Sequence, residues 1–344
     1  HVDHHRLRAS RAPWGARDPS GDSGRAAILH AVKALALKLF GLLLVASAIA
    51  LTLSRAPDRP VQTLVARWAP PPSQFIELDG QLVHLRDEGP RGDPLPLVLV
   101  HGTSASLHTW DGWTAALRGQ RRVIRFDLPG FGLTGPSVAG DYRGDTLARF
   151  TLTLLDRLQV ERFVIGGNSL GGEVAWRVAT LAPGRVERLI LVDASGPAFE
   201  PQSVPVGWII ARVPLANRLL EHLLPRSMVA ASVASVYGDP ARITPELVDR
   251  YFELTLREGN RRALVQRLRQ MQGGEDAERI ATIVQPTLIL WGARDRLIPP
   301  AVGRRFDEQI GHSTLVVFDG LGHVPHEEDP ARTVRPVLDF LGLR

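Results

Sequence analysis

A serine flanked by glycines lies where an apolar segment gives way to a helical one. The segment Gly167–Gly171 (GNSLG) follows the apolar run Phe163–Gly166 and precedes residues with a helical pattern. In a strand–turn–helix setting, this spacing permits a sharp turn that exposes a serine hydroxyl above a sheet. The pattern predicts that Ser169 is a nucleophile, and an ordinary glycine turn is the alternative.

A serine hydroxyl needs a base, and histidine titrates near neutral pH. His323 lies in GLGHVPHEE just after an apolar segment, where small neighbours leave room for the imidazole to reach the serine. His326 is the rival, but its acidic neighbours indicate a helix-start or surface position. His101 precedes a glycine at the end of another apolar segment, where a structural hydrogen bond is favoured. We therefore expect His323 to be the base.

An orienting carboxylate for the histidine is expected at the end of a strand. Asp295 follows the apolar run Thr287–Leu290 in the sequence WGARD and is the favoured acid. Asp193, at the end of Leu189–Val192, is the alternative acid.

Three further acidic residues have other expected roles. Glu327 and Glu328 are close to His323 in sequence but are expected to point along the following segment. Asp127, in DLPGFG, is expected to fix the turn that follows it.

Backbone N–H groups near the serine could stabilise an oxyanion. A glycine in the sequence HGTS, just after Leu95–Val100, permits a tight turn that points the N–H of Thr103 into the site. The second donor is expected to be the N–H of Leu170, immediately after the nucleophile.

Short apolar segments alternate with helical ones, which predicts a mostly parallel sheet covered by helices. The expected strands are Phe75–Leu78 and Gln81–Arg86 around Asp79-Gly80, then Leu95–Val100, Val123–Phe126, Phe163–Gly166, Leu189–Val192, Thr287–Leu290 and Thr314–Phe318. The expected helices between them are His108–Leu117, Asp145–Leu158, Glu173–Ala182, Ala301–Ile310 and Ala331–Phe340.

The alternation stops between residues 199 and 280, where only helical segments occur. This predicts a helical cap inserted into an α/β core formed by residues 74–198 and 281–344. The expected cap helices are Val206–Val213, Ala216–Leu224, Met228–Tyr237, Pro245–Leu256 and Arg261–Met271. The larger apolar cap residues either line a pocket or pack the cap, and packing is favoured for each of Trp208, Leu219, Leu223, Met228 and Tyr237.

The N-terminal region differs from the rest of the chain. Residues 1–25 are polar and rich in Arg, Pro and Gly, which predicts disorder. Residues 26–54 contain the apolar run Leu39–Leu53, which predicts an uncleaved membrane anchor, with a cleaved signal peptide or a buried helix as alternatives. Basic residues before the run favour a cytoplasmic N-terminus, with the following domain outside the cytoplasm. Residues 55–73 contain five prolines and are expected to form a linker with a short helix near Val61–Trp68.

Charge and composition exclude several kinds of protein. The 344 residues carry a net charge of +5, and residues 1–59 account for all of it, so a nucleic-acid-binding surface is not expected on the folded domain. The chain has no cysteine, which excludes disulfides, thiolate metal sites and a cysteine nucleophile.

Five motifs together resemble the α/β-hydrolase superfamily: HGTSASLHTW, DLPGFGLTGP, GGNSLGG, WGARDRLIP and GLGHVPHEEDP. The resemblance covers about residues 74–344. It implies an eight-stranded, mostly parallel sheet with helices on both faces, a helical cap between the sixth and seventh strands, and a triad of Ser169, Asp295 and His323. A serine rather than an aspartate nucleophile is unlike haloalkane dehalogenases and epoxide hydrolases.

The resemblance extends to the meta-cleavage-product C–C hydrolases, which share the GNS elbow. Those enzymes usually have a more glycine-rich oxyanion loop and a Trp after the catalytic His, whereas here Val324 follows His323. We therefore expect a serine carboxylesterase that hydrolyses short-to-medium, fairly apolar esters without a metal or organic cofactor. A C–C hydrolase is the alternative, and a catalytically inactive ligand-binding protein is the alternative from another class.

Overall fold

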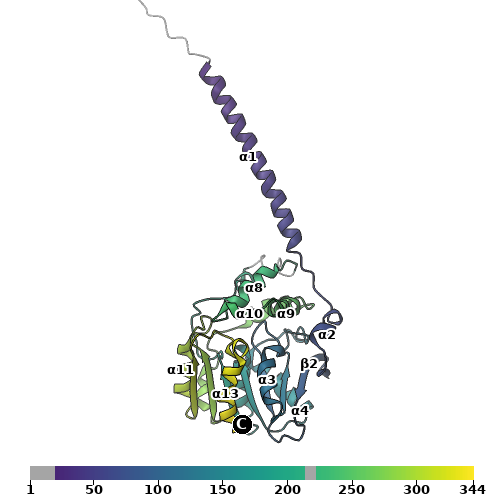
Figure 1. Cartoon of the computed structure of the whole chain (residues 1–344), viewed down its shortest axis with the longest axis vertical. Coiled ribbons are helices and arrows are strands. Elements are labelled where there is room, and N and C mark those ends of the chain that lie inside the picture. Colours follow the sequence, from purple (N-terminus) through teal and green to yellow (C-terminus); the bar gives the residue numbers. More distant parts are fainter. Residues whose placement is uncertain (1–19, 214–221) are drawn as a thin grey trace, which may run out of the picture. The chain divides into compact units, whose positions relative to one another are not determined.

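The computed structural model describes residues 20–213 and 222–344, which fall into two compact units, His1–Leu53 and Ser54–Arg344. The first contains one described helix, α1 (Ser20–Leu53), and the second contains the sheet (Figure 1). Most of the residues expected to be disordered, 1–19 of 1–25, lie outside the described residues. Residues 20–25 belong to α1, because each further residue added to an existing helix gains a hydrogen bond.

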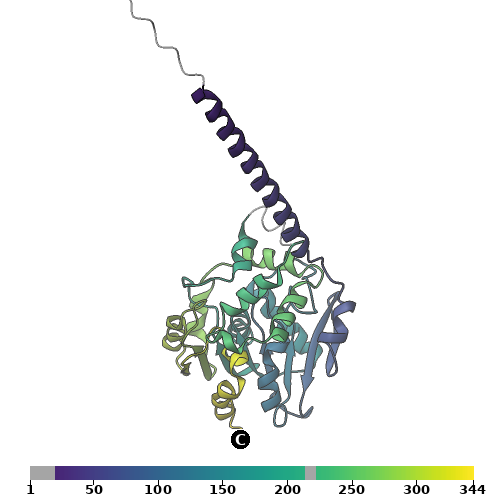
Figure 2. The same ribbon diagram turned by 45° about the horizontal axis from the view of Figure 1, so that its top comes forward.

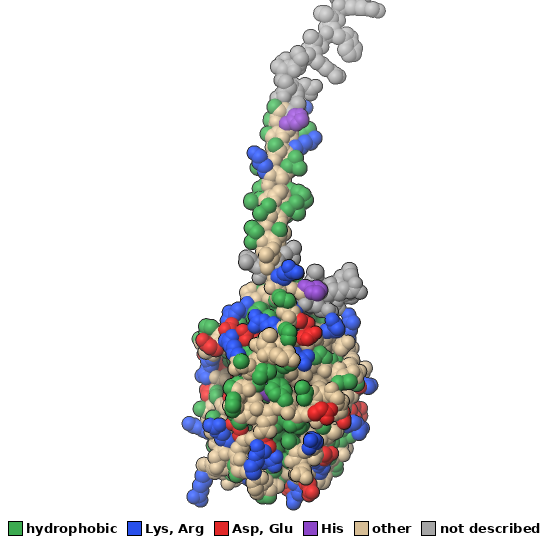
Figure 3. Space-filling model, turned by 90° about the vertical axis from the view of Figure 1, so that its right-hand side faces the viewer, with side chains coloured by type: hydrophobic (Ala, Val, Ile, Leu, Met, Phe, Trp, Pro, Cys, Tyr) green, Lys and Arg blue, Asp and Glu red, His purple; other side chains and the backbone are tan. Residues whose placement is uncertain are grey.

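Helix α1 is long and apolar enough to cross a membrane. Its stretch Ala27–Ala50 has 24 residues and a mean hydropathy of 2.0, and none of it is buried in the structure. At 1.5 Å per residue, it spans about 36 Å, and a bilayer core needs about 20 residues. Apolar side chains surround the helix, with basic ones toward its N-terminal part (Figure 3). A signal sequence passes the same test of length and composition.

The expected eight-stranded, mostly parallel sheet is confirmed. Its order is β1-β2-β4-β3-β5-β6-β7-β8, with β1–β2 and β2–β4 antiparallel and the other pairs parallel. The strands are β1 (Ser73–Leu78), β2 (Gln81–Glu88), β3 (Leu97–Val100), β4 (Val123–Phe126), β5 (Phe163–Asn168), β6 (Val186–Val192), β7 (Thr287–Gly292) and β8 (Ser313–Phe318). Asp79 and Gly80 both have positive φ, the conformation of a tight hairpin turn between β1 and β2.

Helices cover both faces of the sheet because successive residues of a buried strand point to opposite faces. In β3, Val98 and Val100 pack into one core and Leu97 and Leu99 into the other. The first core includes α4 (Gly144–Arg157), α5 (Leu170–Leu181) and α11 (Pro300–Gln309). The second includes α3 (Asp111–Leu117), which follows the short helix η1 (Leu107–Trp110), and α13 (Pro330–Leu341), which follows α12 (Pro325–Glu328).

Between β6 and β7 the chain forms helices and no described strand. We call four of them the inserted helices: α6 (Val206–Arg212), α8 (Arg226–Ala234), α9 (Pro245–Thr255) and α10 (Asn260–Gln270). The short helices η2 (Pro240–Arg242) and η3 (Ala277–Thr282) complete the segment. Figure 2 shows the inserted helices lying across one end of the sheet. Most of the helix expected at residues 216–224 lies outside the described residues.

The proline-rich segment after α1, which begins the linker expected for residues 55–73, is hydrogen-bonded to the inserted segment of the folded unit. The N–H of Ala56 donates to the carbonyl of His222 at 2.9 Å, and the N–H of Leu224 donates to that of Ser54 at 3.0 Å. The short helix α2 (Gln62–Trp68) follows and buries Leu64. We call residues 54–60 the strap.

Candidate active site

Ser169 lies in the turn between β5 and α5. Its φ of 56° and ψ of −117° are strained for a residue with a side chain. The glycines around it permit this turn: a Cβ on Gly167 would lie 2.0 Å from the carbonyl oxygen of Gly171, and one on Gly171 would lie 2.1 Å from that of Val100. The turn is therefore packed too tightly for side chains at either glycine.

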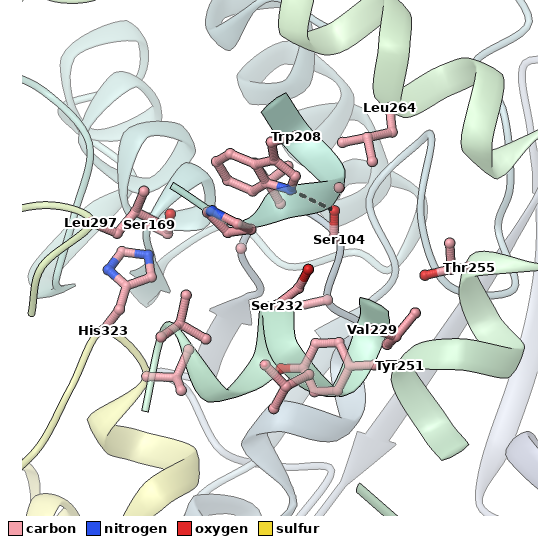
Figure 4. Close-up of a pocket in the computed structure, with 18 of the residues that line it drawn as sticks. Ser104, Ser169, Trp208, Val229, Ser232, Tyr251, Thr255, Leu264, Leu297 and His323 are labelled. Atoms are coloured by element: carbon pink, nitrogen blue, oxygen red, sulfur yellow. Dashed lines mark hydrogen bonds between the residues drawn. The ribbon is translucent and has the colours of Figure 1, made fainter. Parts of the chain in front are cut away.

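His323 and Asp295, at the ends of β8 and β7, are hydrogen-bonded to each other. The Nδ1 atom of His323 lies 2.7 Å from Oδ2 of Asp295. The other carboxylate oxygen accepts the N–H groups of Leu297 and Ile298, at 2.8 and 2.9 Å. In the neutral tautomer that carries its hydrogen on Nδ1 toward this carboxylate, Nε2 is the acceptor on the other side of the ring. Figure 4 shows this ring next to Ser169, and both residues line one cavity.

The loop that carries His323 is held by two side chains that sequence reasoning did not assign to the site. Nδ2 of Asn168 donates to the carbonyl of His323 at 2.9 Å. The carboxylate of Glu328 accepts the N–H groups of Gly238, Asp239 and Gly322, at 3.0, 2.8 and 2.8 Å. The expectation that Glu328 points away along the chain was wrong, because α12 turns the carboxylate back onto these N–H groups.

Asp193 is a second buried carboxyl group beside the pair. Ligand atoms of Asp193, Asp295 and His323 lie within 4.8 Å of one another, and Asp193 Oδ1 accepts the N–H of Gly292 at 3.0 Å. Burial and the neighbouring Asp295 carboxylate raise the pKa of Asp193 well above its ordinary value, which favours its neutral form. The three residues have the spacing of a metal site, but His323 Nδ1 and Asp295 are already bonded to each other.

Thr103 and Leu170 line a cavity together with the serine. Gly102 packs against the turn, since a Cβ there would lie 3.0 Å from Oδ1 of Asn168 and 3.1 Å from Cβ of Ser169. Thr103 follows it, and Leu170 is the first residue of α5, where a backbone N–H has no partner within its own helix. The structure therefore places both residues near the nucleophile, and their role as oxyanion donors stays a prediction.

His101, His84 and Asp127 are buried in structural positions. His101 Nε2 accepts the N–H of Leu128 at 2.9 Å, and its Nδ1 lies 2.7 Å from the Gly102 carbonyl. Burial alone would raise the pKa of Asp127, but His84, whose Nδ1 lies 2.7 Å away, brings it below its ordinary value.

His326 is the second residue of α12, near the helix start as expected, but it does not lie at the surface. Its ring packs against that of Trp110, with centroids 4.0 Å apart, and burial lowers its pKa well below the ordinary value.

Two cavities meet at Ser169, and both are lined by Thr103, Trp208 and Leu297 as well. Cavity A, of about 970 Å³ including space open to solvent, lies under the inserted helices and is lined mainly by apolar side chains. Cavity B, of about 1240 Å³ on the same measure, includes four charged residues: Glu173, Arg212, Arg267 and Glu275.

Of the large apolar cap residues named from the sequence, two line cavity A and two lie elsewhere in the described structure. Trp208 and Met228 line cavity A, and Nε1 of Trp208 donates to Oγ of Ser104 at 3.3 Å. Tyr237 is buried elsewhere and Leu223 pairs with the strap. Leu219 lies outside the described residues.

Known proteins match most of this chain. The sequence model of a family described as the alpha/beta hydrolase fold matches residues 96–330. A 2-hydroxy-6-oxononadienedioate/2-hydroxy-6-oxononatrienedioate hydrolase of Pseudomonas putida is 32% identical over 77% of this chain and 93% of its own. Two solved structures are similar. A meta-cleavage product hydrolase from Pseudomonas fluorescens IP01 has a TM-score of 0.68 and 25% identity, and the match covers 78% of this chain and 97% of that one. A hydrolase from Pseudomonas aeruginosa PA01 has a TM-score of 0.65 and 29% identity, and the match covers 79% of this chain and 99% of that one.

Proposed function

Because this chain belongs to the α/β-hydrolase family, we propose that this hydrolase cleaves carboxylic esters with Ser169 as its nucleophile. The observation that carries the proposal is the 2.7 Å contact of His323 with Asp295, beside a serine on a strained turn. A hydrogen-bonded base and acid next to a serine that lines a cavity are the parts that nucleophilic acyl transfer requires.

In the proposed reaction, the Ser169 hydroxyl attacks the ester carbonyl while Nε2 of His323 takes its proton. The N–H groups of Thr103 and Leu170 stabilise the oxyanion that forms. His323 then returns the proton to the leaving alcohol, and Asp295 stabilises the charged imidazole. A water molecule deprotonated by His323 hydrolyses the acyl-enzyme. Each step uses groups of the chain and water, without a metal or organic cofactor.

The lining of cavity A supports an apolar substrate. Its walls include Met228, Val229, Val233 and Leu264, so an aliphatic chain would be transferred from water to an apolar surface there. We propose esters with short-to-medium, fairly apolar chains. A panel of p-nitrophenyl esters of increasing chain length tests this preference.

Replacing the nucleophile tests the proposed mechanism. Ser169→Ala should lower kcat by several orders of magnitude, on the order of 10⁶, because the acyl-enzyme cannot form. Circular dichroism checks that the variant folds. A variant that keeps more than about a tenth of the activity would exclude Ser169 as the nucleophile.

Cleavage of a carbon–carbon bond, as in meta-cleavage-product hydrolases, is the second candidate. It is supported by the similarity to the meta-cleavage product hydrolase and to the 2-hydroxy-6-oxononadienedioate hydrolase named above. That reaction must protonate a substrate carbon before cleavage, whereas an ester's alkoxide can be protonated directly by His323. Measured kcat/KM for an ester and for a vinylogous diketone distinguishes the two. A tenfold preference for the diketone, about 1.4 kcal/mol, would favour the C–C reaction.

We also propose that α1 anchors the enzyme, with residues 60–344 outside the cytoplasm. Its length and apolar composition support an anchor, and the basic residues before the apolar run support this orientation. Fractionation of cells that express the full chain is the test. Activity in the soluble cytosolic fraction would exclude the anchor, and a shortened exported form would indicate signal cleavage.

A further inference from the structure

The outer side of α6 exposes large apolar side chains. Val206, Ile209 and Val213, which directly follows the helix, have exposed fractions of 46, 51 and 47%. At about 100° per residue, these positions lie on one side of the helix. The opposite side carries Trp208 and Ala211, which line cavity A. This segment is therefore apolar on both sides, although one of them faces solvent.

The concentration of apolar side chains at α6 is unusual for this folded unit. Five other large apolar residues are exposed in the described part of residues 54–344. Four of them come from different segments: Leu82, Val138, Val284 and Val317. The fifth is Met271. Met271 directly follows α10, which packs against α6. Scattered apolar residues are normal on a surface, whereas a cluster indicates something that covers it.

The covalent connection between α1 and Ser54 limits how far Ser54 can lie from a bilayer that α1 crosses. If Ala27–Ala50 crosses a bilayer, only residues 51–53 separate it from Ser54. Ser54 is bonded to Leu224, which is two residues from the start of α8, and α8 packs against α6. Four extended residues reach about 14 Å at most. Chain connectivity alone therefore keeps Ser54, and Leu224 bonded to it, within about 14 Å of the end of such a span.

Positive charge near Ser54 and on α6 suits a lipid surface. The guanidinium groups of Arg55 and Arg212 are exposed and form no ion pair with any residue that the structure describes. Basic side chains at a membrane surface are attracted to anionic headgroups.

We propose that the outer face of α6, formed by Val206, Ile209 and Val213, docks on the bilayer, and that the ester reaches Ser169 from the bilayer. This inference rests on the proposed anchor and esterase activity. Because the inner side of α6 lines cavity A, only the thickness of one helix, about 10 Å, separates a docked bilayer from the cavity. The substrate class is then an ester dissolved in the membrane.

Site-specific labelling tests the docking. Because the chain has no cysteine, a single introduced cysteine is the only thiol that reacts with the label. Ile209→Cys and Val213→Cys would each carry an environment-sensitive fluorophore in the full chain, reconstituted into phosphatidylcholine–phosphatidylglycerol vesicles. We expect quenching by a headgroup-labelled nitroxide lipid at both positions. The matched controls Val138→Cys and Val284→Cys, which are also exposed and apolar, should not be quenched. Equal quenching at all four positions, or at none, would overturn the proposal.

Turnover in two settings tests the delivery of the substrate. Ile209→Glu with Val213→Glu should lower hydrolysis of a long-chain ester held in the vesicles about tenfold, because two apolar contacts are lost. Hydrolysis of a water-soluble short ester should not change, and Val284→Glu should change neither. An equal loss on both esters, or no loss on either, would overturn delivery from the bilayer.

The docking readout is independent of catalysis. The labels can be placed in a Ser169→Ala background, so an enzyme that hydrolyses no ester would refute the proposed function without affecting the quenching result. A label that is shielded only at high protein concentration, without lipid quenching, would mean that a second copy covers α6 and would overturn the membrane assignment.

Discussion

Asp295 and Asp193 are two buried carboxyl groups beside one imidazole, and their surroundings separate their roles. Asp295 accepts two N–H groups and bonds His323, whereas Asp193 accepts one N–H group from Gly292. Burial and the neighbouring Asp295 carboxylate raise the pKa of Asp193 well above its ordinary value, so the neutral form is favoured at Asp193. This difference could not be read from the sequence, where each residue simply follows an apolar strand.

The two carboxyl groups should therefore respond differently to the same substitution. Asp295→Asn should lower kcat/KM by on the order of 10⁴, because the amide favours the wrong histidine tautomer. Asp193→Asn should have a mild effect, because an amide resembles a protonated carboxyl group. Ester hydrolysis by the two purified variants is the measurement, and the reverse ranking would assign the acid to the end of β6.

Protonation of Asp193 also predicts how stability depends on pH. Its pKa is raised in the folded state, so above the ordinary value of 3.8 the native chain holds a proton that the unfolded chain releases. The contribution of the protonated Asp193 to the free energy of unfolding is fully present below pH 3.8. It is lost as the pH rises toward the raised pKa of the folded state, by at most about 1.4 kcal/mol per pH unit.

Asp193→Asn removes this titration. The free energy of unfolding of the variant relative to the original chain should therefore rise between pH 4 and pH 7, roughly the window above an ordinary carboxyl pKa. Urea unfolding at several pH values measures it. A constant difference across that range would mean that Asp193 is ionised in the folded state.

At the scale of elements, the sequence predicted the strands well and some helix ends poorly. Segments such as Val123–Phe126 are buried on both faces, so a continuous apolar run identifies them. Helix α5 begins at Leu170, three residues before the expected start at Glu173. Gly171 and Gly172 read locally as a turn, but in the fold they let the helix approach β3 and Ala194 closely. Tertiary contact therefore overrides glycine's weak helix propensity.

The loop between β8 and α12 depends on Glu328. Glu328→Gln replaces one acceptor oxygen with a donor that faces backbone N–H groups, which should shift the His323 loop. We expect kcat to fall by up to about 10²-fold with KM little changed, since small displacements of a base are costly. Glu327→Gln is the matched control, because Glu327 instead accepts from Tyr251 at 2.8 Å. An unchanged kcat in Glu328→Gln would show that other contacts hold the loop.

At the scale of the whole molecule, the strap shows what local patterns could not predict. Its prolines indicate a linker, yet Arg59 exchanges backbone hydrogen bonds with Leu256 and Glu258 almost two hundred residues later in the chain. Asp58 also forms an ion pair with the buried side chain of Arg261 and accepts the N–H of Gly259 at 3.1 Å. Such pairing depends on where the inserted helices lie, and no neighbouring residue encodes it. By contrast, a single apolar run was enough to predict a segment long enough to cross a membrane.

The contacts of the strap therefore determine at which residue the chain can be truncated to remove the proposed anchor without destabilising the folded unit. A chain that begins at Ser54 keeps the bonds to Leu224 and His222 and the Asp58–Arg261 pair, so it should fold, remain in solution without detergent and hydrolyse short esters normally. A chain that begins at Val61 loses them all, and its Tm should fall by about 5–10 °C, because each lost hydrogen bond contributes about 1 kcal/mol. Cavity A should also loosen, since Leu224 and Arg261 both line it. Thermal unfolding and ester hydrolysis of the two truncated chains compare these outcomes directly. Equal Tm values would mean that the strap, although hydrogen-bonded, contributes nothing to the stability of the folded unit.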